Sequence, residues 1–540
     1  SGGATRQFRI DGEEKNKEFL GHFLFSIPYH LNNVNDVLII GPGGGLEILI
    51  GKYFKVRHID AVDINSDIIN ILTGRNKNDR LRDIYSRLAL SNKETTTVKY
   101  YVDDGRSFLS RKNAGFSKYD IVQLTNVDLL STLTSGGMVL SESYLYTQEA
   151  LRYYYDSLKE NGYIQICYWA GPFGLRLFLT ALEMLRTIKV ERPENSLVVV
   201  GDMKWNINLL IKKGMFSDRE LAEIRKICAA DNFKVFFTPD MPAYFGDYFI
   251  SESVNWFQVD SRHYCLASRS DTRKSLIRSF PYNINPTYDD KPFFYSIRTS
   301  KGYSFFTGVL VTLFQNKINL VLSLTGIALA FLIILLPLIL KEIKAGYIGM
   351  VPFRHLLFFG ITGLAFSLIE VIMIQKVAIF AGGPFYSMCL TLPTILIFYS
   401  LGAFSTVKIK IPRVWFLVIS VGGIVLYGLL GYLFFDNVIR SLFYLRHLER
   451  IIFTVIIISP LGFFLGIPLS VVLEAVKGIV EKIITPWMWG VNSCGNVVGA
   501  LFFVPIAHIT GFNLLLMVSC FLYLVALCLL LPDTQTKFSK

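Results

Sequence analysis

Long apolar runs separated by short basic loops dominate the sequence from residue 318 onward. Seven of these runs each approach the roughly 20 residues that an α-helix needs to cross a bilayer. They lie at 318–340, 355–375, 386–405, 414–435, 452–473, 489–507 and 512–531. With 52% hydrophobic residues, the chain is too apolar for an ordinary water-soluble protein. We therefore predict a multi-pass helical membrane domain over 318–532, followed by a tail at 533–540.

The first 300 residues carry most of the charge and alternate between strand and helix patterns. Strands are expected at 37–40, 58–64, 98–102, 120–124, 163–168, 197–200 and 207–212, and helices at 46–54, 66–72, 79–89, 147–160 and 172–188. Such alternation predicts an α/β fold with a doubly wound, mostly parallel sheet. We place this domain at 36–300, after a strand and helix segment at 1–35. Residues 231–300 have no clear period. A linker at 301–317 contains an apolar stretch (303–314) that is too short to span and is expected at the membrane interface.

Charge and composition argue against a nucleic acid partner, a disulfide framework and a metal. The net charge is +12, but many basic residues flank apolar runs, as in "KEIK" (341–344) and "VKIKIPR" (407–413). Such lysines are typical of membrane borders, so no nucleic acid partner is expected. The seven cysteines form no CxxC pair and the seven histidines are scattered, so we expect neither a disulfide framework nor a metal.

The stretch "LIIGPGGGLEIL" (38–49) places a glycine turn directly after a strand and before a helix. Gly41, Gly43 and Gly45 would let the backbone approach a ligand, and the helix N-terminus offers unpaired N–H groups. A plain tight turn is the alternative. Asp63 ends the next strand about 20 residues later, a spacing that suits a carboxylate bound to ribose hydroxyls.

The third strand ends in "VDDGRSFL", which brings Asp103 and Asp104 to the same edge of the sheet. Either carboxylate could accept from an adenine amino group, and one of them could instead cap the helix that follows. A dinucleotide site usually has the pattern G-x-G-x-x-G, but position 46 is leucine here. Three acidic positions and a G-x-G-x-G turn favour S-adenosylmethionine over NAD.

Residues 7–300 resemble the spermidine synthase family, a branch of the Rossmann-like methyltransferase folds that uses decarboxylated S-adenosylmethionine. The whole chain resembles the bacterial membrane-fused members of this group. The similar stretches are "GPGGGLE" (41–47), "VLSESYLYTQEA" (139–150), "PTYDDKPFFY" (286–295), "SLIEVIMIQKVAIFAGGPFYS" (367–387), "PLGFFLGIPL" (460–469) and "PWMWGVNSCGNVVGA" (486–500). The resemblance implies a transferase domain followed by membrane helices.

Two departures from the family pattern affect the expected chemistry. The family turn reads GGGDGG, and its aspartate holds the amine end of the substrate, whereas Gly44 occupies that position here. The family's T-D-S-S-D signature corresponds to "LTNVDLL", with Asn126 in place of the aspartate that helps to deprotonate the attacking amine. Asparagine is a poor general base. Asp128 lies two residues further and would point the same way if the strand continued.

The resemblance also implies an acceptor pocket. Glu142 would line it, and Tyr144 and Tyr146 would form its wall or pack at a helix start instead. Asp289 and Asp290 would bind an amine or form ion pairs with Lys291.

Polar residues inside apolar spans are costly and are usually paired or functional. Glu370, Gln375 and Asn492 are of this kind, and we expect Glu370 to have its partner on another helix. Gly495 and Gly499 form a GxxxG pattern that favours close helix packing. These polar groups either stabilise packing or line a substrate path.

The leading hypothesis is a membrane-integrated transferase that uses S-adenosylmethionine or its decarboxylated form. It would move a methyl or aminopropyl group to an amine or to another membrane-accessible acceptor such as a lipid. The alternatives are a transporter or sensor that binds an adenosyl ligand without turnover, and a scaffold with an inactive enzyme domain. Expected partners are the lipid bilayer and the acceptor, and a homodimer is left open.

The expected location is the bacterial inner membrane, with the soluble domain in the cytoplasm, where such cofactors are made. This orientation conflicts with the positive-inside rule. With seven spans, it places a group of basic residues on the side of the membrane opposite to the cytoplasm. The group is Lys341, Lys344, Arg354, Lys408, Lys410 and Arg413.

Overall fold

The computed structural model describes residues 14–74, 96–112, 119–127, 143–202, 205–241, 259–297, 317–345, 353–409, 411–476 and 481–537. The chain divides into two compact units, Ser1–Lys301 and Gly302–Lys540, which we describe separately.

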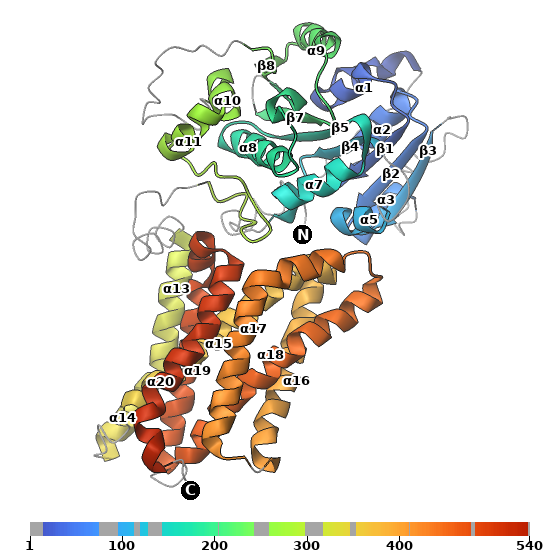
Figure 1. The fold of residues 1–540 in the computed structure, drawn as a ribbon. Coiled ribbons are helices and arrows are strands. Elements are labelled where there is room, and N and C mark those ends of the chain that lie inside the picture. Colours follow the sequence, from blue (N-terminus) through green and yellow to red (C-terminus); the bar gives the residue numbers. More distant parts are fainter. Residues whose placement is uncertain are drawn as a thin grey trace. The chain divides into compact units, whose positions relative to one another are not determined.

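The first unit alternates strands and helices along the chain (Figure 1). Its strands are β1 (Asp36–Ile40), β2 (His58–Asp63), β3 (Thr97–Val102), β4 (Tyr119–Thr125), β5 (Leu158–Trp169), β6 (Leu197–Gly201), β7 (Asn206–Lys212) and β8 (Lys234–Phe237). Its α-helices are α1 (Ile27–Leu31), α2 (Leu46–Tyr53), α3 (Ser66–Leu72), α5 (Gly105–Lys112), α7 (Gln148–Asp156), α8 (Pro172–Thr187), α9 (Asp218–Ala230), α10 (Ser261–Ser268) and α11 (Ser270–Ser279). Short 3₁₀ turns are η1 (Glu14–His22), η2 (Leu24–Ser26), η3 (Tyr144–Tyr146) and η4 (Pro193–Ser196).

The strands form one sheet in the order β3-β2-β1-β4-β5-β7-β6-β8. Strands β1 to β5 are parallel, whereas β7 runs antiparallel to β5 and β6. The antiparallel β7 beside β5 is the arrangement of the Rossmann-like methyltransferase fold, so the predicted fold class is confirmed. The chain moves outward from β1 to β2 and β3, then returns to β4 on the other side. The switch point between β1 and β4 is where open α/β sheets bind ligands.

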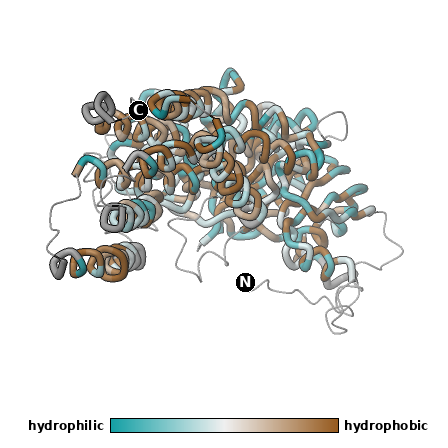
Figure 2. Tube along the Cα trace, turned by 90° about the horizontal axis from the view of Figure 1, so that it is seen from below, coloured by the Kyte–Doolittle hydropathy of each residue, from teal (hydrophilic) through white to brown (hydrophobic). Residues whose placement is uncertain are grey.

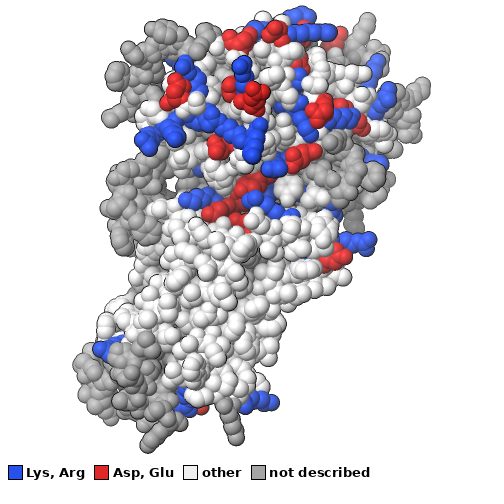
Figure 3. Space-filling model, in the orientation of Figure 1, with Lys and Arg blue, Asp and Glu red and all other residues white. Residues whose placement is uncertain are grey.

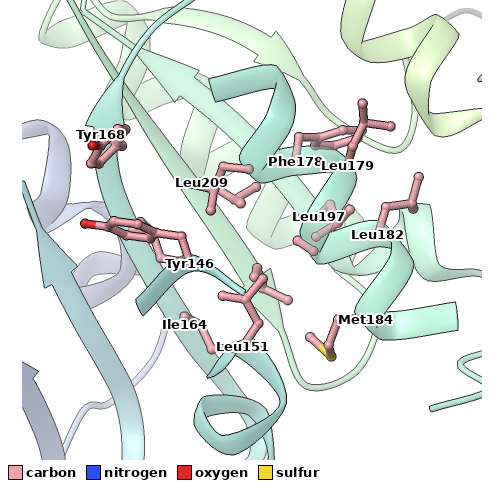
Figure 4. Close-up of a cluster of buried hydrophobic side chains, with 14 of the residues drawn as sticks. Tyr146, Leu151, Ile164, Tyr168, Phe178, Leu179, Leu182, Met184, Leu197 and Leu209 are labelled. Atoms are coloured by element: carbon pink, nitrogen blue, oxygen red, sulfur yellow. The ribbon is translucent and has the colours of Figure 1, made fainter. Parts of the chain in front are cut away.

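Helices cover both faces of this sheet because its central strands are apolar on both sides. One core lies between the sheet and α5, α7, α8 and α10; Figure 4 shows side chains such as Tyr146, Ile164 and Phe178 meeting there. A second core lies under α1, α2 and α9, with Ile39 and Ile121 among its residues. The carboxyl ends of β1 to β4 therefore sit on a scaffold that is packed from both sides.

Three sequence expectations for this unit need correction or lie outside the described residues. The helix expected at 147–160 ends at Asp156, and Leu158 already pairs with Tyr119 of β4. Asn161 and Gly162 look like a helix stop, but Asn161 adopts a φ of 62° inside β5, near a register shift opposite β4. The aperiodic region after 231 contains β8, α10 and α11. The helix expected at 79–89 lies outside the described residues.

The second unit is entirely helical over its described residues. Its helices are α13 (Lys317–Ala330), the π-helical turn η5 (Phe331–Leu335), α14 (Leu336–Ala345), α15 (Phe353–Ala381), α16 (Pro384–Lys408), α17 (Arg413–Ser441), α18 (His447–Val476), α19 (Glu481–Thr510) and α20 (Phe512–Lys537). The segments α13, η5 and α14 form one continuous helix. When it is counted once, seven helices among the described residues are long and apolar enough to cross a membrane. This number equals the number of spans expected from the sequence.

Glycines allow two pairs of these helices to pack with their backbones close together. A Cβ atom added to Gly499 of α19 would lie 2.6 Å from the Leu364 carbonyl oxygen of α15, and one added to Gly495 would clash with the Gly360 carbonyl. In the same way, Gly402 and Gly466 bring α16 and α18 together. The GxxxG pattern at Gly495 and Gly499 therefore acts as a packing face.

The surface of the second unit is suited to lipid. Its helices carry many hydrophobic residues (Figure 2), and many of their large apolar side chains are exposed. In Figure 3 the described Lys, Arg, Asp and Glu side chains of this unit lie near the ends of its helices, and the surface between them is uncharged in that view. Exposed apolar area on this scale is expected at a membrane contact.

Candidate functional site

The glycine turn connects β1 to α2 at the switch point of the sheet. Gly41, Gly43 and Gly45 all have positive φ values, of 71°, 46° and 80°. The turn is closed by a 2.8 Å hydrogen bond from the Gly45 N–H to the Pro42 carbonyl. A Cβ atom on Gly41 would lie 2.9 Å from both γ-methyl groups of Val127, which follows β4. The turn therefore requires glycine on both conformational and steric grounds.

Gly41→Val is expected to destabilise the first unit by about 1–3 kcal/mol, because a β-branched residue is strained at positive φ and would also displace Val127. Thermal melting of the purified chain measures the effect. Gly44→Ala is the matched control in the same turn, because Gly44 is outside the left-handed region. Equal melting temperatures for wild type and Gly41→Val would show that a β-branched residue at position 41 causes no strain in the turn.

Asp63 ends β2 beside this turn and is 9% exposed. Burial raises the pKa of its carboxyl, and a 2.8 Å hydrogen bond from the Asn65 N–H opposes that rise. The next residue, Ile64, is 59% exposed although it is aliphatic. Asp63 and Ile64 thus present a carboxylate and an apolar surface at the same strand end.

The two acidic residues after β3 have different roles. Asp104 caps α5, because its Oδ1 accepts from the Ser107 N–H at 2.9 Å. Asp103 accepts from the Asp104 N–H at 2.9 Å and also forms an ion pair with Arg111. The Asp103 N–H donates to the Asp63 carbonyl at 3.0 Å, so these two acidic residues are held at adjoining strand ends.

Asn126 follows β4 at the other side of the switch point. It is exposed, its φ is 49°, and its N–H donates to the Cys167 carbonyl at 2.9 Å. Asparagine tolerates this left-handed conformation better than most residues. Since β4 ends at Thr125, strand alternation gives no reason for residues 126 and 128 to point the same way. Asp128 and Glu142 lie outside the described residues.

The two tyrosines of the expected pocket differ in exposure. Tyr146 is completely buried, packs against Tyr168 and Phe294, and donates its hydroxyl to the Val127 carbonyl at 2.9 Å. Tyr146 therefore belongs to the core between the sheet and α7, and its hydroxyl stabilises the turn after β4. Tyr144 is only partly buried.

Asp289 forms a buried ion pair with Arg106, the second residue of α5. Two hydrogen bonds of 2.9 and 2.8 Å join the guanidinium to the carboxylate, and Thr147 donates to the same carboxylate at 2.7 Å. Burial alone would lower the pKa of Arg106, but Asp289 holds it above the usual value. Asp289 therefore has a structural partner in Arg106, and the neighbouring Asp290 is partly buried.

A second buried arginine fixes the segment that carries Asp289. Arg176 of α8 donates to the carbonyls of Asn285, Phe293, Phe294 and Ser296, each at 2.9 Å. No carboxylate among the described residues pairs with Arg176, and burial lowers its pKa to about 9. The sequence contains no local signal for either arginine contact, because the partners lie more than 100 residues away.

Polar residues cross-link the helices of the second unit. Asn492 of α19 donates to the Phe359 carbonyl of α15 at 3.0 Å, which is a packing contact. Lys376 of α15 pairs with Asp436 of α17 at 2.6 Å and also donates to Asn513 of α20, which in turn donates to Asp436 at 2.7 Å. Glu370 and Gln375 are both partly buried on α15.

Lys376→Met is expected to lower the stability of the second unit by about 1–3 kcal/mol, because it leaves the Asp436 carboxylate without its cation. The effect is moderated because Asp436 is 30% exposed. The double variant Lys376→Met/Asp436→Leu should recover most of the loss. Thermal melting of single and double variants in one detergent tests this, and additive losses would refute the coupling.

Part of this chain is similar in sequence to one curated protein. The sequence is 29% identical over 114 residues to the polyamine aminopropyltransferase of Alkaliphilus metalliredigens (strain QYMF), which covers 21% of this chain and 36% of that protein. The chain thus spans about a third of the length of this curated relative. No family model matches the chain.

Solved structures with similar folds are distant in sequence. Spermidine synthase from Thermotoga maritima is 18% identical and covers 39% of this chain and 65% of its own, with a TM-score of 0.26. Human methyltransferase-like protein 13, in complex with SAH, is 18% identical and covers 45% of this chain and 98% of its own, with a TM-score of 0.27. The fold assignment itself rests on the strand order.

Proposed function

We propose that the chain is a membrane-integrated transferase whose first unit binds S-adenosylmethionine or its decarboxylated form. The observation that carries this proposal is the convergence of Asp63 with the glycine turn at the switch point between β1 and β4. Open α/β sheets bind their ligands there. Similarity to a curated polyamine aminopropyltransferase supports the transferase class.

The described residues fit an adenosyl ligand. Gly41, Gly43 and Gly45, with positive φ values and no side chains, allow a ligand to approach the backbone of the turn. Asp63 would accept hydrogen bonds from both ribose hydroxyls, and exposed Ile64 would cover one face of the adenine. Asp103 is better placed than the capping Asp104 to accept from the adenine amino group.

Catalysis by this site would rest mainly on positioning. A sulfonium cofactor supplies an activated carbon, so an acceptor amine held in line with the breaking C–S bond needs little further activation. The amine must also give up a proton, and Asn126 cannot take it at neutral pH. We propose Asp128 as the candidate base, with Glu142 and Tyr144 lining the acceptor pocket.

We further propose that the acceptor is an amine or a lipid that reaches the site from the membrane. The seven apolar helices support an integral membrane protein. We place the first unit in the cytoplasm of a bacterial cell, where adenosyl cofactors are made, although the basic residues at the ends of α14, α15, α16 and α17 favour the opposite orientation.

A ligand-binding sensor or transporter is the second candidate, because Asn126 replaces the carboxylate that an aminopropyltransferase uses. The full chain in nanodiscs should be titrated calorimetrically with S-adenosylmethionine, its decarboxylated form and 5′-methylthioadenosine. Mass spectrometry would then follow transfer to polyamines and to lipid extracts. Binding with transfer supports the enzyme, binding without transfer supports the sensor, and no binding rejects both.

A further inference from the structure

Glu47 is a buried carboxylate directly behind the glycine turn. It is the second residue of α2, and only 8% of it is exposed. The sequence of α2, LEILIGKY, is otherwise largely apolar, so an acidic residue on the buried side of this helix is unexpected. The Thr125 side chain, at the end of β4, lies near Glu47, and its buried hydroxyl has no hydrogen-bond partner among the described residues.

Other buried carboxylates of the first unit have clear structural partners. Glu220 pairs with Lys212 at 2.8 Å and accepts from Tyr163. Asp60 accepts from the Tyr119 hydroxyl at 2.6 Å. Among the described residues, by contrast, no cationic side chain pairs with Glu47. A buried carboxylate without a cation is costly unless something else supplies the charge.

The surroundings of Glu47 explain its titration. Burial raises its pKa to about 7, while its own backbone N–H and the Thr125 hydroxyl oppose the rise. The titratable groups that face it are Tyr29 of α1 and Cys167 of β5, and burial raises the pKa of both well above neutral pH. Both are therefore uncharged at pH 7, and neither offers a positive charge. Perturbed carboxylates of this kind concentrate at functional sites.

The position of Glu47 matches a gap in the ligand site. Gly44 replaces the aspartate that the resembled family uses for the amine end of its substrate. Glu47 lies about one helical turn further along the chain. It sits between the glycine turn, which follows β1, and the end of β4, and these two strand ends flank the switch point. A ligand seated on the turn would have its charged end beside these two strand ends.

We propose that Glu47 accepts a hydrogen bond from the ammonium group of the adenosyl ligand, in place of the aspartate missing at position 44. The proposal rests on the proposed function, because it assumes that an adenosyl ligand occupies the glycine turn. It assigns to this carboxylate the recognition of the cationic end, while Asp63 recognises the ribose.

Proton linkage follows from this assignment. Because burial raises the pKa of Glu47 to about 7, part of the free protein carries a protonated Glu47 near neutral pH, and a bound ammonium group favours the ionised form. Binding should therefore release a fraction of a proton near neutral pH, and affinity should rise as pH increases from 6 to 8. A neutral ligand without an ammonium group should show neither effect.

Calorimetry on the full chain in nanodiscs tests the proposal with two ligands. Decarboxylated S-adenosylmethionine carries the ammonium group, and 5′-methylthioadenosine is its neutral counterpart. For Glu47→Gln we expect an affinity loss of about 10-fold to 100-fold for the first ligand, as for hydrogen bonds to charged groups, and no loss for the second. Asp67→Asn, at an exposed position in the first turn of α3, is the matched control.

The outcomes separate the inference from the function on which it rests. If Glu47→Gln loses affinity equally for both ligands, Glu47 only maintains the fold. If the affinity of Glu47→Gln for decarboxylated S-adenosylmethionine equals that of the wild type, Glu47 does not bind the ammonium group. In the wild type, titrations in two buffers of different ionisation enthalpy measure proton release without any variant, and zero release refutes the inference. If the wild type binds neither ligand, the proposed function fails and the inference fails with it.

Discussion

Asp63→Asn is expected to weaken the binding of 5′-methylthioadenosine and of the sulfonium ligands by about 100-fold, because two hydrogen bonds to a charged acceptor are lost. The carboxylate has two oxygens for the two ribose hydroxyls, whereas asparagine has one oxygen and an NH₂ group that cannot accept. Calorimetric titration measures the change. The expected loss is the same for the neutral and the charged ligands, because all of them carry the ribose.

The fold of the variant has to be checked independently, because Asp63 also accepts from the Asn65 N–H. The asparagine oxygen can keep that single bond, so thermal melting should change little. Asp67→Asn serves again as the control, since it removes an exposed carboxylate two residues beyond Asn65. Wild-type affinity in a folded Asp63→Asn protein would remove Asp63 from the ligand site.

Asp289→Asn is expected to destabilise the contact between α5 and the segment around Asp289 by about 3 kcal/mol, because the buried Arg106 loses its counterion. The Arg106 side chain is 1% exposed, so water cannot replace the carboxylate. Hydrogen–deuterium exchange of peptides from α5 and from residues 285–297 measures the loss locally. Exchange through this opening should accelerate by about two orders of magnitude.

Asp156→Asn is the matched control, because its ion pair with Arg152 on α7 is more than half exposed and contributes little. The experiment also separates the two interpretations of Asp289. If exchange is unchanged in Asp289→Asn but affinity for an amine acceptor falls, the residue is part of the acceptor pocket. Faster exchange in α5 supports the structural role that its geometry indicates.

Local patterns in the sequence were sufficient to predict the parallel strands and the glycine turn. Strand β1 is a short apolar run, β2 and β4 mix polar residues with buried apolar ones, and β3 is a β-branched and aromatic run around a lysine. A turn signal follows each strand, and Asp63 and Asp103 follow from where the strands end. The seven apolar segments were equally clear, because a span of about 20 residues needs no tertiary context.

Features that depend on distant contacts could not be predicted. The pairing of Arg106 with Asp289 joins residues 183 positions apart, and nothing near either residue signals it. The helix expected at 147–160 is too long, because Asn161 and Gly162 also suit a strand irregularity, and β4, the strand that pairs there, cannot be recognised from the local sequence. Lys376 lies on a membrane-spanning helix, but its partner Asp436 lies near the end of another helix, where an acidic residue is unremarkable.

Val127 contacts the glycine turn on one side, and its carbonyl accepts from the Tyr146 hydroxyl on the other. A larger side chain at 127 would push against Gly41, and a smaller one would leave the turn unsupported. Among related sequences, we therefore expect positions 41, 127 and 146 to change together rather than independently. A relative that keeps the glycine but loses the tyrosine hydroxyl should carry a compensating change in the turn after β4.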